Sequence, residues 1–509
     1  MYRKRQEWCG CVDRSKATIV TQDAKLDATP QIMDRKLIGD LEQLLGTRAV
    51  LSQAADLQLY EYDGSVEQAK PDCIVFPKTT QEVSEIARLA GKYGVPLVGR
   101  GAGTGLSGGA IARHGGIVVV FSRMNRILDI DYENQRAVVQ PGVVNLDLTC
   151  AVEHAGLYFA PDPSSQKACT IGGNVAENSG GPHTLAYGVT TNHVTGLELV
   201  LPDGDIVRIG GKTFDAPGYD LTGLMVGSEG TLAIVTEITV RLSRKPEAVK
   251  TLLAIFETVE DATQTVVEIT ARAITPAACE MFDALTLRAI EAFVHAGFPL
   301  DSAAVLLIEV EGLREAVEAQ EAEVTEACRL HRAREVRKAR DAAERDLLWK
   351  GRKNAFGAIG RLAPNAYVQD GVIPRTKLPE TLRYVDKVSQ KYGLRISNVF
   401  HAGDGNLHPI ILFDQRVPGQ FEKVVGAAKE IMKFCVDVGG TLSGEHGIGM
   451  EKNELMPLLF SDDDLELMKR VRDAFNPSGR LNPGKILPIG KGCGEVRILR
   501  TPALTATPA

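Results

Sequence analysis

The sequence of 509 residues has no pair of cysteines spaced as C-x-x-C, and its nine cysteines are scattered and odd in number. A disulfide framework or an all-cysteine metal cluster is therefore not expected, and we interpret the cysteines as reduced thiols of a cytoplasmic protein. The sequence also has no iron–sulfur or haem-attachment pattern. If the protein performs redox chemistry, its electrons must pass to an external acceptor.

Long apolar runs are missing as well. No stretch approaches the roughly 20 apolar residues that a transmembrane helix needs. The basic residues 1–9 are not followed by the apolar segment of a secretory signal, and we expect residues 1–33 to form a loose extension. The formal net charge of −7 argues against a general nucleic-acid binder, which carries a basic surface.

Glycine, by contrast, is concentrated in residues 96–109, where a short apolar run leads into six glycines. Such a loop lets backbone N–H groups surround an anion, so a phosphate or pyrophosphate ligand is implied. A P-loop would require G-K-[S/T], which is absent. A Rossmann loop would require a helix opening on its third glycine, whereas residues 110–121 lead directly into a strand. The loop of another nucleotide-binding fold fits better.

The residues around this loop predict a β-α-β unit. Strands are expected at residues 73–76 and 96–98, and T-x-x-E at residues 79–82 has the form of a capping box for the helix between them. Two further glycine-rich segments, residues 170–181 and 227–230, are predicted as loops beside strands. Three such loops close together in the sequence favour a shared ligand.

The pattern changes near residue 245, where we place a domain boundary. Strands at residues 251–256 and 304–310 alternate with helices at residues 259–273 and 315–332. This alternation predicts an α+β substrate domain.

The most specific chemical signal is H-A-G-D-G-N-L-H at residues 401–408. Asp-Gly between two strand-like runs predicts a hairpin turn in which Gly403 pairs with Asn406 and His401 with His408. Directly opposed residues share a face with Cβ atoms about 4.5–5.5 Å apart, so both imidazoles could bind one metal ion.

A third ligand is available in the glycine-rich residues 439–449, where Glu445 and His446 are adjacent. In an extended loop these two side chains would point to opposite sides, so that one binds the metal while the other transfers a proton. Single histidines are usually core or hydrogen-bonding residues. The combination of two histidines and a carboxylate nevertheless favours a catalytic metal site with open coordination positions.

Several of these motifs together resemble the FAD-binding domain of the vanillyl-alcohol-oxidase type of flavoenzyme. The resemblance rests on Pro77, residues 100–105, 161–163, 171–174 and 227–230. It implies that the first loop holds the pyrophosphate and that the later segments line the isoalloxazine and adenine. Since residues 96–109 contain no His or Cys, we expect dissociable, non-covalent FAD. The residues implied for FAD are Pro77, Arg100, Gly101, Ala102, Gly103, Thr104, Gly105, Gly109, Pro161, Asp162, Ser165, Ile171, Gly172, Gly173, Asn174, Asn178, Glu229, Gly230, Ile234 and Asn482.

Residues 34–488 resemble the FAD-linked 2-hydroxyacid dehydrogenases, and within them most closely the FAD-binding subunits of bacterial glycolate oxidases. The resemblance implies that His401, His408 and Glu445 bind a divalent metal such as Zn, Mn or Fe. It also implies that His446 is the base and that Arg352 of W-x-G-R-K holds the substrate carboxylate, for which a guanidinium fork is suited. Dicarboxylate-specific relatives carry a lysine just before the D-x-x-x-P segment. Gln369 stands there, which disfavours a dicarboxylate.

The predicted fold is therefore α+β, with a two-subdomain FAD-binding domain, an α+β substrate domain and a C-terminal helical segment. The expected ranges are 1–33 (extension), 34–245 (FAD-binding), 246–488 (substrate and metal) and 489–509 (tail). The expected activity is oxidation of a small 2-hydroxy acid, glycolate to glyoxylate, by hydride transfer to flavin as the base takes the hydroxyl proton. The alternatives are a D-lactate dehydrogenase with a quinone or cytochrome acceptor, and a non-catalytic flavin subunit.

The resemblance also implies partners and a location. A second flavin subunit and an iron–sulfur subunit would accept the electrons, and no nucleic acid is expected to bind. The protein is expected in the cytoplasm, with peripheral membrane association at the inner face of the cell membrane through these partners.

Overall fold

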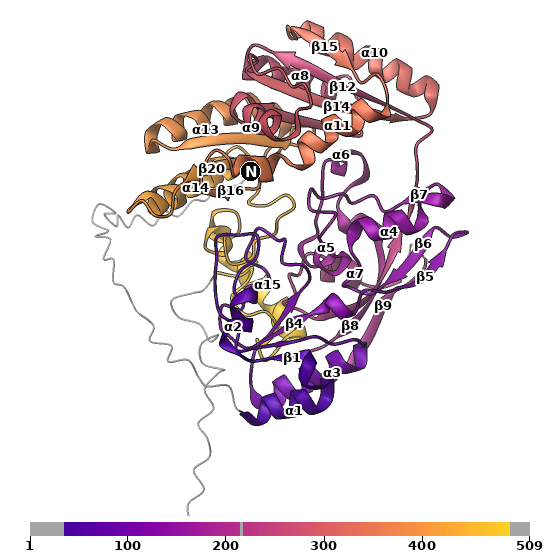
Figure 1. Ribbon diagram of the computed structural model, residues 1–509, viewed down its shortest axis with the longest axis vertical. Coiled ribbons are helices and arrows are strands. Elements are labelled where there is room, and N and C mark those ends of the chain that lie inside the picture. The colour runs from indigo at the N-terminus through magenta and orange to yellow at the C-terminus, as the bar shows by residue number, and fades with distance from the viewer. Residues whose placement is uncertain (1–34, 214–216, 489–509) are drawn as a thin grey trace, which may run out of the picture.

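The computed structural model describes residues 35–213 and 217–488, so the predicted extension (1–33) and tail (489–509) lie outside the described residues. Figure 1 shows the first half of the chain, indigo to magenta, in the lower part and the orange segments in the upper part. The yellow C-terminal segment with α15 (Asp462–Phe475) returns to the lower part. There Leu481 pairs in parallel with Leu97, which ties the segment after α15 to the strand that enters the glycine loop.

The first sheet contains the predicted parallel strands with one strand inserted between them. Its order is β1 (Val50–Leu51), β2 (Cys73–Val75), β4 (Ile117–Val120) and β3 (Leu97–Arg100). β4 pairs in parallel with both β2 and β3 and therefore separates the two strands that helix α3 (Thr80–Tyr93) connects. Between β3 and β4 the described chain contains no helix, as the argument against a Rossmann loop requires.

Helix α3 begins at the predicted cap, but only half of the capping box forms. Thr79 Oγ1 accepts a hydrogen bond from the backbone N–H of Glu82 at 3.1 Å. The Glu82 carboxylate accepts from the backbone N–H of Lys78 instead of that of Thr79. The helix ends at Gly94, whose φ of 65° is the left-handed conformation that glycine adopts without strain.

The second sheet is antiparallel and has the order β5 (Ile127–Asp131), β6 (Arg136–Val139), β10 (Ile234–Arg241), β8 (Val194–Val200) and β9 (Ile206–Gly210). Buried and half-buried residues alternate along β10, as they do in a strand with one face on the core. The helices α4 (Asn145–Val152) and α5 (Ile171–Glu177) contribute to the same apolar core through Leu148 and Val175.

The prediction of a loop over residues 170–181 is wrong, because α5 occupies most of this segment. Thr170 Oγ1 accepts from the backbone N–H of Gly173 at 3.2 Å and so caps the helix. Ile171 and Val175, four residues apart, are fully buried on one side. The helix ends at Asn178 in the left-handed conformation, with φ 52°. Burial of that apolar side outweighs the low helix propensity of the two glycines.

The second half forms a nine-stranded sheet with helices on both faces (Figure 1). Its path is β15 (Glu335–Lys338), β12 (Ala248–Phe256), β14 (Ala304–Gly312), β13 (Ala278–Asp283), β18 (Arg395–His401), β19 (Asn406–Leu407) and β17 (Gly371–Val372); β20 (Pro409–Phe413) pairs with β18 and with β16 (Asn365–Val368). One core contains residues of α8 (Val259–Ala271), α10 (Arg314–Leu330), α13 (Leu378–Tyr392) and α14 (Gln420–Asp437). The other contains residues of α9 (Ala284–Val294), α11 (Ala342–Lys353) and α12 (Ala355–Ile359).

Alternate residues of one strand enter these two cores. In β12, Leu252 and Ala254 pack in the first core, whereas Leu253 and Ile255 pack in the second. The continuous apolar run predicted as a strand at residues 251–256 thus reflects burial on both faces.

The hairpin at residues 401–408 forms, but its predicted register is wrong by two residues. His401 pairs with Asn406 and Asn398 with Pro409, so residues 402–405 form a four-residue loop. In this loop Gly405 has a positive φ (79°) and Asp404 does not, whereas the expected two-residue turn would need both. A shift of two preserves the face, and the ring centroids of His401 and His408 lie 5.1 Å apart as diagonal neighbours.

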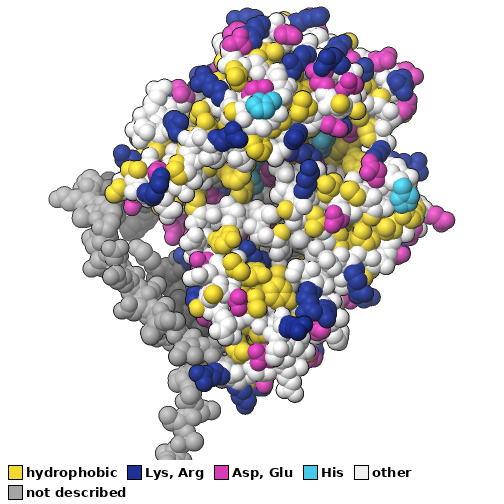
Figure 2. Space-filling model, in the orientation of Figure 1, with side chains coloured by type: hydrophobic (Ala, Val, Ile, Leu, Met, Phe, Trp, Pro, Cys, Tyr) yellow, Lys and Arg dark blue, Asp and Glu magenta, His cyan; other side chains and the backbone are white. Residues whose placement is uncertain are grey.

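All six cysteines within the described residues are free. Among the described helices, none combines the length and apolar character that crossing a membrane requires. Side chains of both charge signs are interspersed over the end of the molecule that carries α10 (Figure 2).

Candidate active site

A cavity of about 610 Å³ lies where the glycine loop, α5, the end of α11 and the nine-stranded sheet meet. Its walls include most of the residues predicted for FAD and all five predicted for chemistry. These are Arg100, Gly101, Ala102, Gly103, Thr104, Gly105, Gly109, Ser165, Gly172, Gly173, Asn174, Glu229, Gly230 and Ile234, together with Arg352, His401, His408, Glu445 and His446.

The glycine loop approaches other backbone and side chains closely. A Cβ at Gly101 would lie 2.3 Å from Thr170 Oγ1, the atom that caps α5. A Cβ at Gly103 would lie 2.3 Å from Arg100 Nη2, and Gly103 has φ 70°. Arg100 is buried, and its Nη1 has no hydrogen-bond partner among the described residues. A buried guanidinium nitrogen without a partner, beside a glycine loop in the cavity wall, fits a bound pyrophosphate.

Six residues predicted for FAD lie outside the cavity wall, namely Pro77, Pro161, Asp162, Ile171, Asn178 and Asn482. Ile171 is fully buried in the core, and Asn178 Oδ1 accepts from the backbone N–H of Thr191. Asn482 Nδ2 donates to the carbonyls of Gly109 and Glu229, which joins two cavity segments. Asn482 Oδ1 is buried and has no partner in the described chain, so a ligand group could still donate to it.

Three candidate metal ligands converge in the cavity. His401 Nε2 lies 3.0 Å and His408 Nε2 3.2 Å from Glu445 Oε1. The three ligand atoms all lie within 4.8 Å of one another. His401 and His408 come from the hairpin and Glu445 from the loop after α14. Two imidazoles and one carboxylate in this arrangement fit a divalent ion such as Zn, Mn or Fe with open positions.

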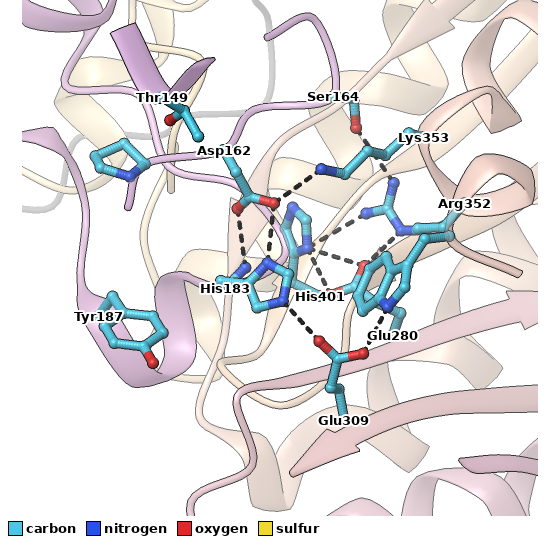
Figure 3. Close-up of polar contacts among 12 residues, drawn as sticks. Thr149, Asp162, Ser164, His183, Tyr187, Glu280, Glu309, Arg352, Lys353 and His401 are labelled. Atoms are coloured by element: carbon cyan, nitrogen blue, oxygen red, sulfur yellow. Dashed lines mark hydrogen bonds and ion pairs between the residues drawn. The ribbon is translucent and has the colours of Figure 1, made fainter. Parts of the chain in front are cut away.

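A second carboxylate, Glu280 of β13, orients this set and was not found from the sequence. His401 Nδ1 lies 2.8 Å from Glu280 Oε1 (Figure 3). This contact leaves His401 Nε2 directed at Glu445. Outer carboxylates of this kind fix the tautomer of a metal-binding histidine. Burial would raise the pKa of Glu280, but the charges of Arg352 and His401 outweigh it and lower that pKa.

Arg352 links this carboxylate to the cavity. Its Nε donates to Glu280 Oε2 at 2.5 Å, Nη2 lies 3.3 Å from His401 Nδ1, and Nη1 reaches Ser164 Oγ at 3.5 Å (Figure 3). One edge of the guanidinium is therefore held by Glu280, while the residue also contributes to the cavity wall. Gln369, at the position where a lysine would be expected for a dicarboxylate substrate, donates to Glu451 at 3.1 Å.

The loop that carries Glu445 and His446 is not extended, contrary to prediction. Asp370 Oδ2 accepts from Ser443 Oγ and from three consecutive backbone N–H groups, those of Gly444, Glu445 and His446. The chain curls around this one oxygen, so the Glu445 and His446 side chains reach the same cavity instead of opposite sides. His446 Nε2 lies 4.0 Å from Glu445 Oε1.

His446 is placed to accept a proton. Its ring stacks on His408 at a centroid distance of 4.9 Å, and its Nδ1 has no partner within the described part of the chain. Burial lowers the pKa of His446 to about 4, so the imidazole is neutral at physiological pH. Burial would raise the pKa of Glu445, but the neighbouring His401 and His408 hold that pKa well below its usual range.

The comparisons with known proteins cover nearly the whole chain. The family of FAD binding domains matches residues 71–210, and the family of FAD linked oxidases, C-terminal domain, matches residues 245–486. The chain is 44% identical over 478 residues to the glycolate oxidase subunit GlcD of Escherichia coli, which covers 94% of this chain and 96% of that protein. It is 44% identical over 430 residues to GlcD of Bacillus subtilis, covering 84% and 92%. A D-lactate dehydrogenase of Anaerostipes hadrus is 33% identical over 432 residues, covering 82% and 90%.

Solved structures confirm the predicted type of fold. p-Cresol methylhydroxylase superimposes with a TM-score of 0.76 at 18% identity, covering 89% of this chain and 97% of that one. The 4-ethylphenol oxidase of Gulosibacter chungangensis gives a TM-score of 0.74 at 20% identity, with the same coverage. The chain therefore carries an FAD-binding domain and belongs to the family of FAD-linked oxidases that includes GlcD and the D-lactate dehydrogenases.

Proposed function

We propose that this protein oxidises a small 2-hydroxy acid, glycolate to glyoxylate, in an FAD-dependent reaction. The observation that carries the proposal is the convergence of Arg352, His446 and the His401–His408–Glu445 set on one cavity that also contains the glycine loop. The 44% identity to two GlcD proteins favours glycolate. D-Lactate is the second candidate, since relatives with that name are 33% identical or less.

Each of these cavity groups has one role in the proposed reaction. Arg352 binds the substrate carboxylate with the guanidinium edge that Glu280 leaves free. His446, neutral at physiological pH, accepts the proton of the α-hydroxyl. His401, His408 and Glu445 would hold a divalent ion, which would supply a Lewis acid for that hydroxyl. The glycine loop and α5 would hold FAD without a covalent bond, and FAD would supply the two-electron acceptor.

The apolar wall around these groups suits a small monocarboxylate. Phe356, Val368, Val399 and Ile410 line the same cavity as Arg352 and the histidines. Gln369, directed at Glu451, offers no cation to a second carboxylate. We further propose that the electrons leave through a second flavin subunit and an iron–sulfur subunit, through which the protein would associate with the inner face of the cell membrane.

The test is anaerobic reduction of the flavin by glycolate or D-lactate in metal-replete protein. The loss of flavin absorbance measures this reduction. The His446→Ala variant should retain FAD and lose reduction by either substrate, because the other two histidines of the described cavity wall, His401 and His408, are both directed at Glu445. Reduction of that variant at the native rate would refute the role of His446. If neither acid bleaches the native protein, the alternative of a non-catalytic flavin subunit is favoured. Acid precipitation should release all of the flavin.

A further inference from the structure

A buried charged network joins the two parts of the chain beside the candidate active site (Figure 3). His183 stands at its centre, at the N-terminus of the short helix α6 (Thr184–Tyr187). Its Nδ1 lies 2.9 Å from Asp162 Oδ2 and its Nε2 lies 3.3 Å from Glu309 Oε1. Its backbone N–H also donates to Asp162 Oδ1. Asp162 follows β7 (Leu157–Tyr158), whereas Glu309 belongs to β14 of the nine-stranded sheet, so the imidazole bridges segments far apart in the sequence.

Glu309 is fully buried and accepts from several further donors. Arg345 donates twice, through Nε and Nη2, at 2.9 and 2.7 Å. The indole N–H of Trp349 donates at 2.7 Å and Thr251 Oγ1 at 2.5 Å. The ring of His183 lies against the Trp349 indole at a centroid distance of 5.1 Å. Glu309 is therefore the point at which β14, α11 and His183 meet.

The charges of this network are fixed over the physiological range. Burial would lower the pKa of His183, but Asp162 and Glu309 outweigh it and raise the pKa to about 10. Burial would raise the pKa of Asp162, but His183 and Lys353 lower it to about 2. The His183 cation is thus held between two buried anions, each of which also contacts a second cation, Lys353 at Asp162 and Arg345 at Glu309.

The same network reaches the residue proposed to bind substrate. Trp349, Arg352 and Lys353 stand on the last turns of α11, at positions i, i+3 and i+4, which share one side of a helix. Lys353 Nζ lies 3.2 Å from Asp162 Oδ2, and Arg352 Nη1 lies 3.5 Å from Ser164 Oγ. The end of α11 is therefore fastened to residues 162–164 on one side and, through Trp349 and Glu309, to His183 on the other.

We propose that His183 is a positioning residue, which clamps α11 between Asp162 and Glu309 and thereby fixes Arg352 at the cavity. The inference rests on the proposed function in so far as it takes Arg352 as the group that binds the carboxylate. It assigns to His183 no contact with the substrate. It also explains why Asp162, predicted to bind FAD, lies outside the cavity wall: its carboxylate is engaged by His183 and Lys353.

The first experiment uses tryptophan fluorescence and needs no activity. The chain has two tryptophans, Trp8 and Trp349, so Trp8→Phe leaves Trp349 as the only reporter. In the holoprotein with this background, His183→Gln should increase the acrylamide quenching constant of Trp349 by about threefold, because the indole loses its clamp. His193→Gln is the matched control, since His193 is also buried and hydrogen-bonded, through Nε2 to the carbonyl of Tyr187, but lies outside the network. Its quenching constant should equal that of the parent. Equal constants for His183→Gln and the parent would overturn the proposal.

The second experiment measures KM for glycolate and the limiting rate of flavin reduction. His183→Gln should raise KM at least tenfold with full FAD content and change the limiting rate less than threefold. In the background of Arg352→Lys, the same substitution should change kcat/KM less than threefold, since the two residues act as one unit. Additive effects of the two substitutions would show that His183 only stabilises the fold, and would overturn the proposal.

A third variant keeps the test decisive if His183→Gln does not fold. Trp349→Phe removes the N–H that is donated to Glu309 and keeps a ring against His183. It should also raise KM without loss of FAD, and an unchanged KM would contradict the clamp. Absence of flavin reduction by any 2-hydroxy acid in the native protein would refute the proposed function alone, because the quenching experiment still decides whether His183 clamps α11.

Discussion

Asp370→Asn is the substitution from which the structure predicts the most specific effect. Asp370 is fully buried, and its Oδ2 accepts four hydrogen bonds from the loop that carries Glu445 and His446. Lys452 Nζ, also buried, lies 3.6 Å from the same oxygen. Burial would raise the pKa of Asp370, but His446 and Lys452 hold that pKa well below its usual range, so the group is a carboxylate.

The expected loss of stability follows from this geometry. A hydrogen bond to a charged acceptor contributes about 1.5–3 kcal/mol and one to a neutral acceptor about 0.5–1.5 kcal/mol, so each of the four bonds weakens by about 1 kcal/mol in the asparagine variant. The total is about 4 kcal/mol, and Lys452 in addition loses a buried counter-charge. Because the loop then no longer curls around a single anion, His446 is displaced. A displacement of about 1 Å costs on the order of a hundredfold in rate.

Asp283→Asn is the matched control. Asp283 is half-buried and also accepts four hydrogen bonds, two from Thr286 and two from Asn398, at the start of α9 and away from the cavity wall. Burial raises the pKa of Asp283, so its charged form is less favoured than that of Asp370. Replacing Asp283 by asparagine should therefore cost less stability than replacing Asp370. Thermal unfolding and anaerobic flavin reduction would be compared in both variants. We expect both to lose stability, but only Asp370→Asn to lose at least tenfold in rate. Equal rates in the two variants would refute the role of Asp370.

Three further predictions concern the cofactor, the metal and the clamp. Gly101→Ala should lower the stability of the apoprotein by about 1–3 kcal/mol and weaken FAD binding, because its Cβ would overlap Thr170 Oγ1. The control Gly105→Ala, whose Cβ would meet its nearest neighbour at 3.9 Å, should leave apoprotein stability unchanged. Equal losses of stability for the two variants in urea unfolding would contradict this prediction. Glu445→Gln or exhaustive chelation should abolish flavin reduction by glycolate while FAD stays bound. Added Zn or Mn should restore flavin reduction in the chelated native protein but not in the Glu445→Gln variant. Full activity of protein that contains no metal by elemental analysis would exclude the metal site. His183 has a folded-state pKa of about 10, above the unfolded value of about 6.5, so its contribution to stability is complete below pH 6.5 and is lost as the pH rises through 10. The difference in unfolding free energy between the native protein and His183→Gln should therefore be about 2–3 kcal/mol smaller at pH 8.5 than at pH 5.5. A difference that does not change with pH would refute the raised pKa of His183 in the folded protein.

Local patterns in the sequence were sufficient for the elements and for part of the site. Glycines at 99–109 predicted an anion-binding loop, because only the local backbone decides where N–H groups can converge. The two-residue period of a strand placed His401 and His408 on one face, and this survived a register error of two residues because a shift by two preserves the face. The helix α5 was missed, because its two glycines favoured a loop and its apolar pair, Ile171 and Val175, is too short a pattern to predict a helix.

Only the tertiary structure decided which buried charges support these groups. Glu280 lies 121 residues from His401, Asp370 lies 76 residues from His446, and His183 lies 126 residues from Glu309. Glu280 and Glu309 stand in strands that each contain a second acid, and Asp370 directly precedes a strand, so no local spacing identifies the partner of any of them. A desolvated carboxylate is stable only where donors or cations meet it, and the packing of the sheets determines where that is. The sequence by itself determined the local chemistry, whereas the fold determined which charges hold that chemistry in place.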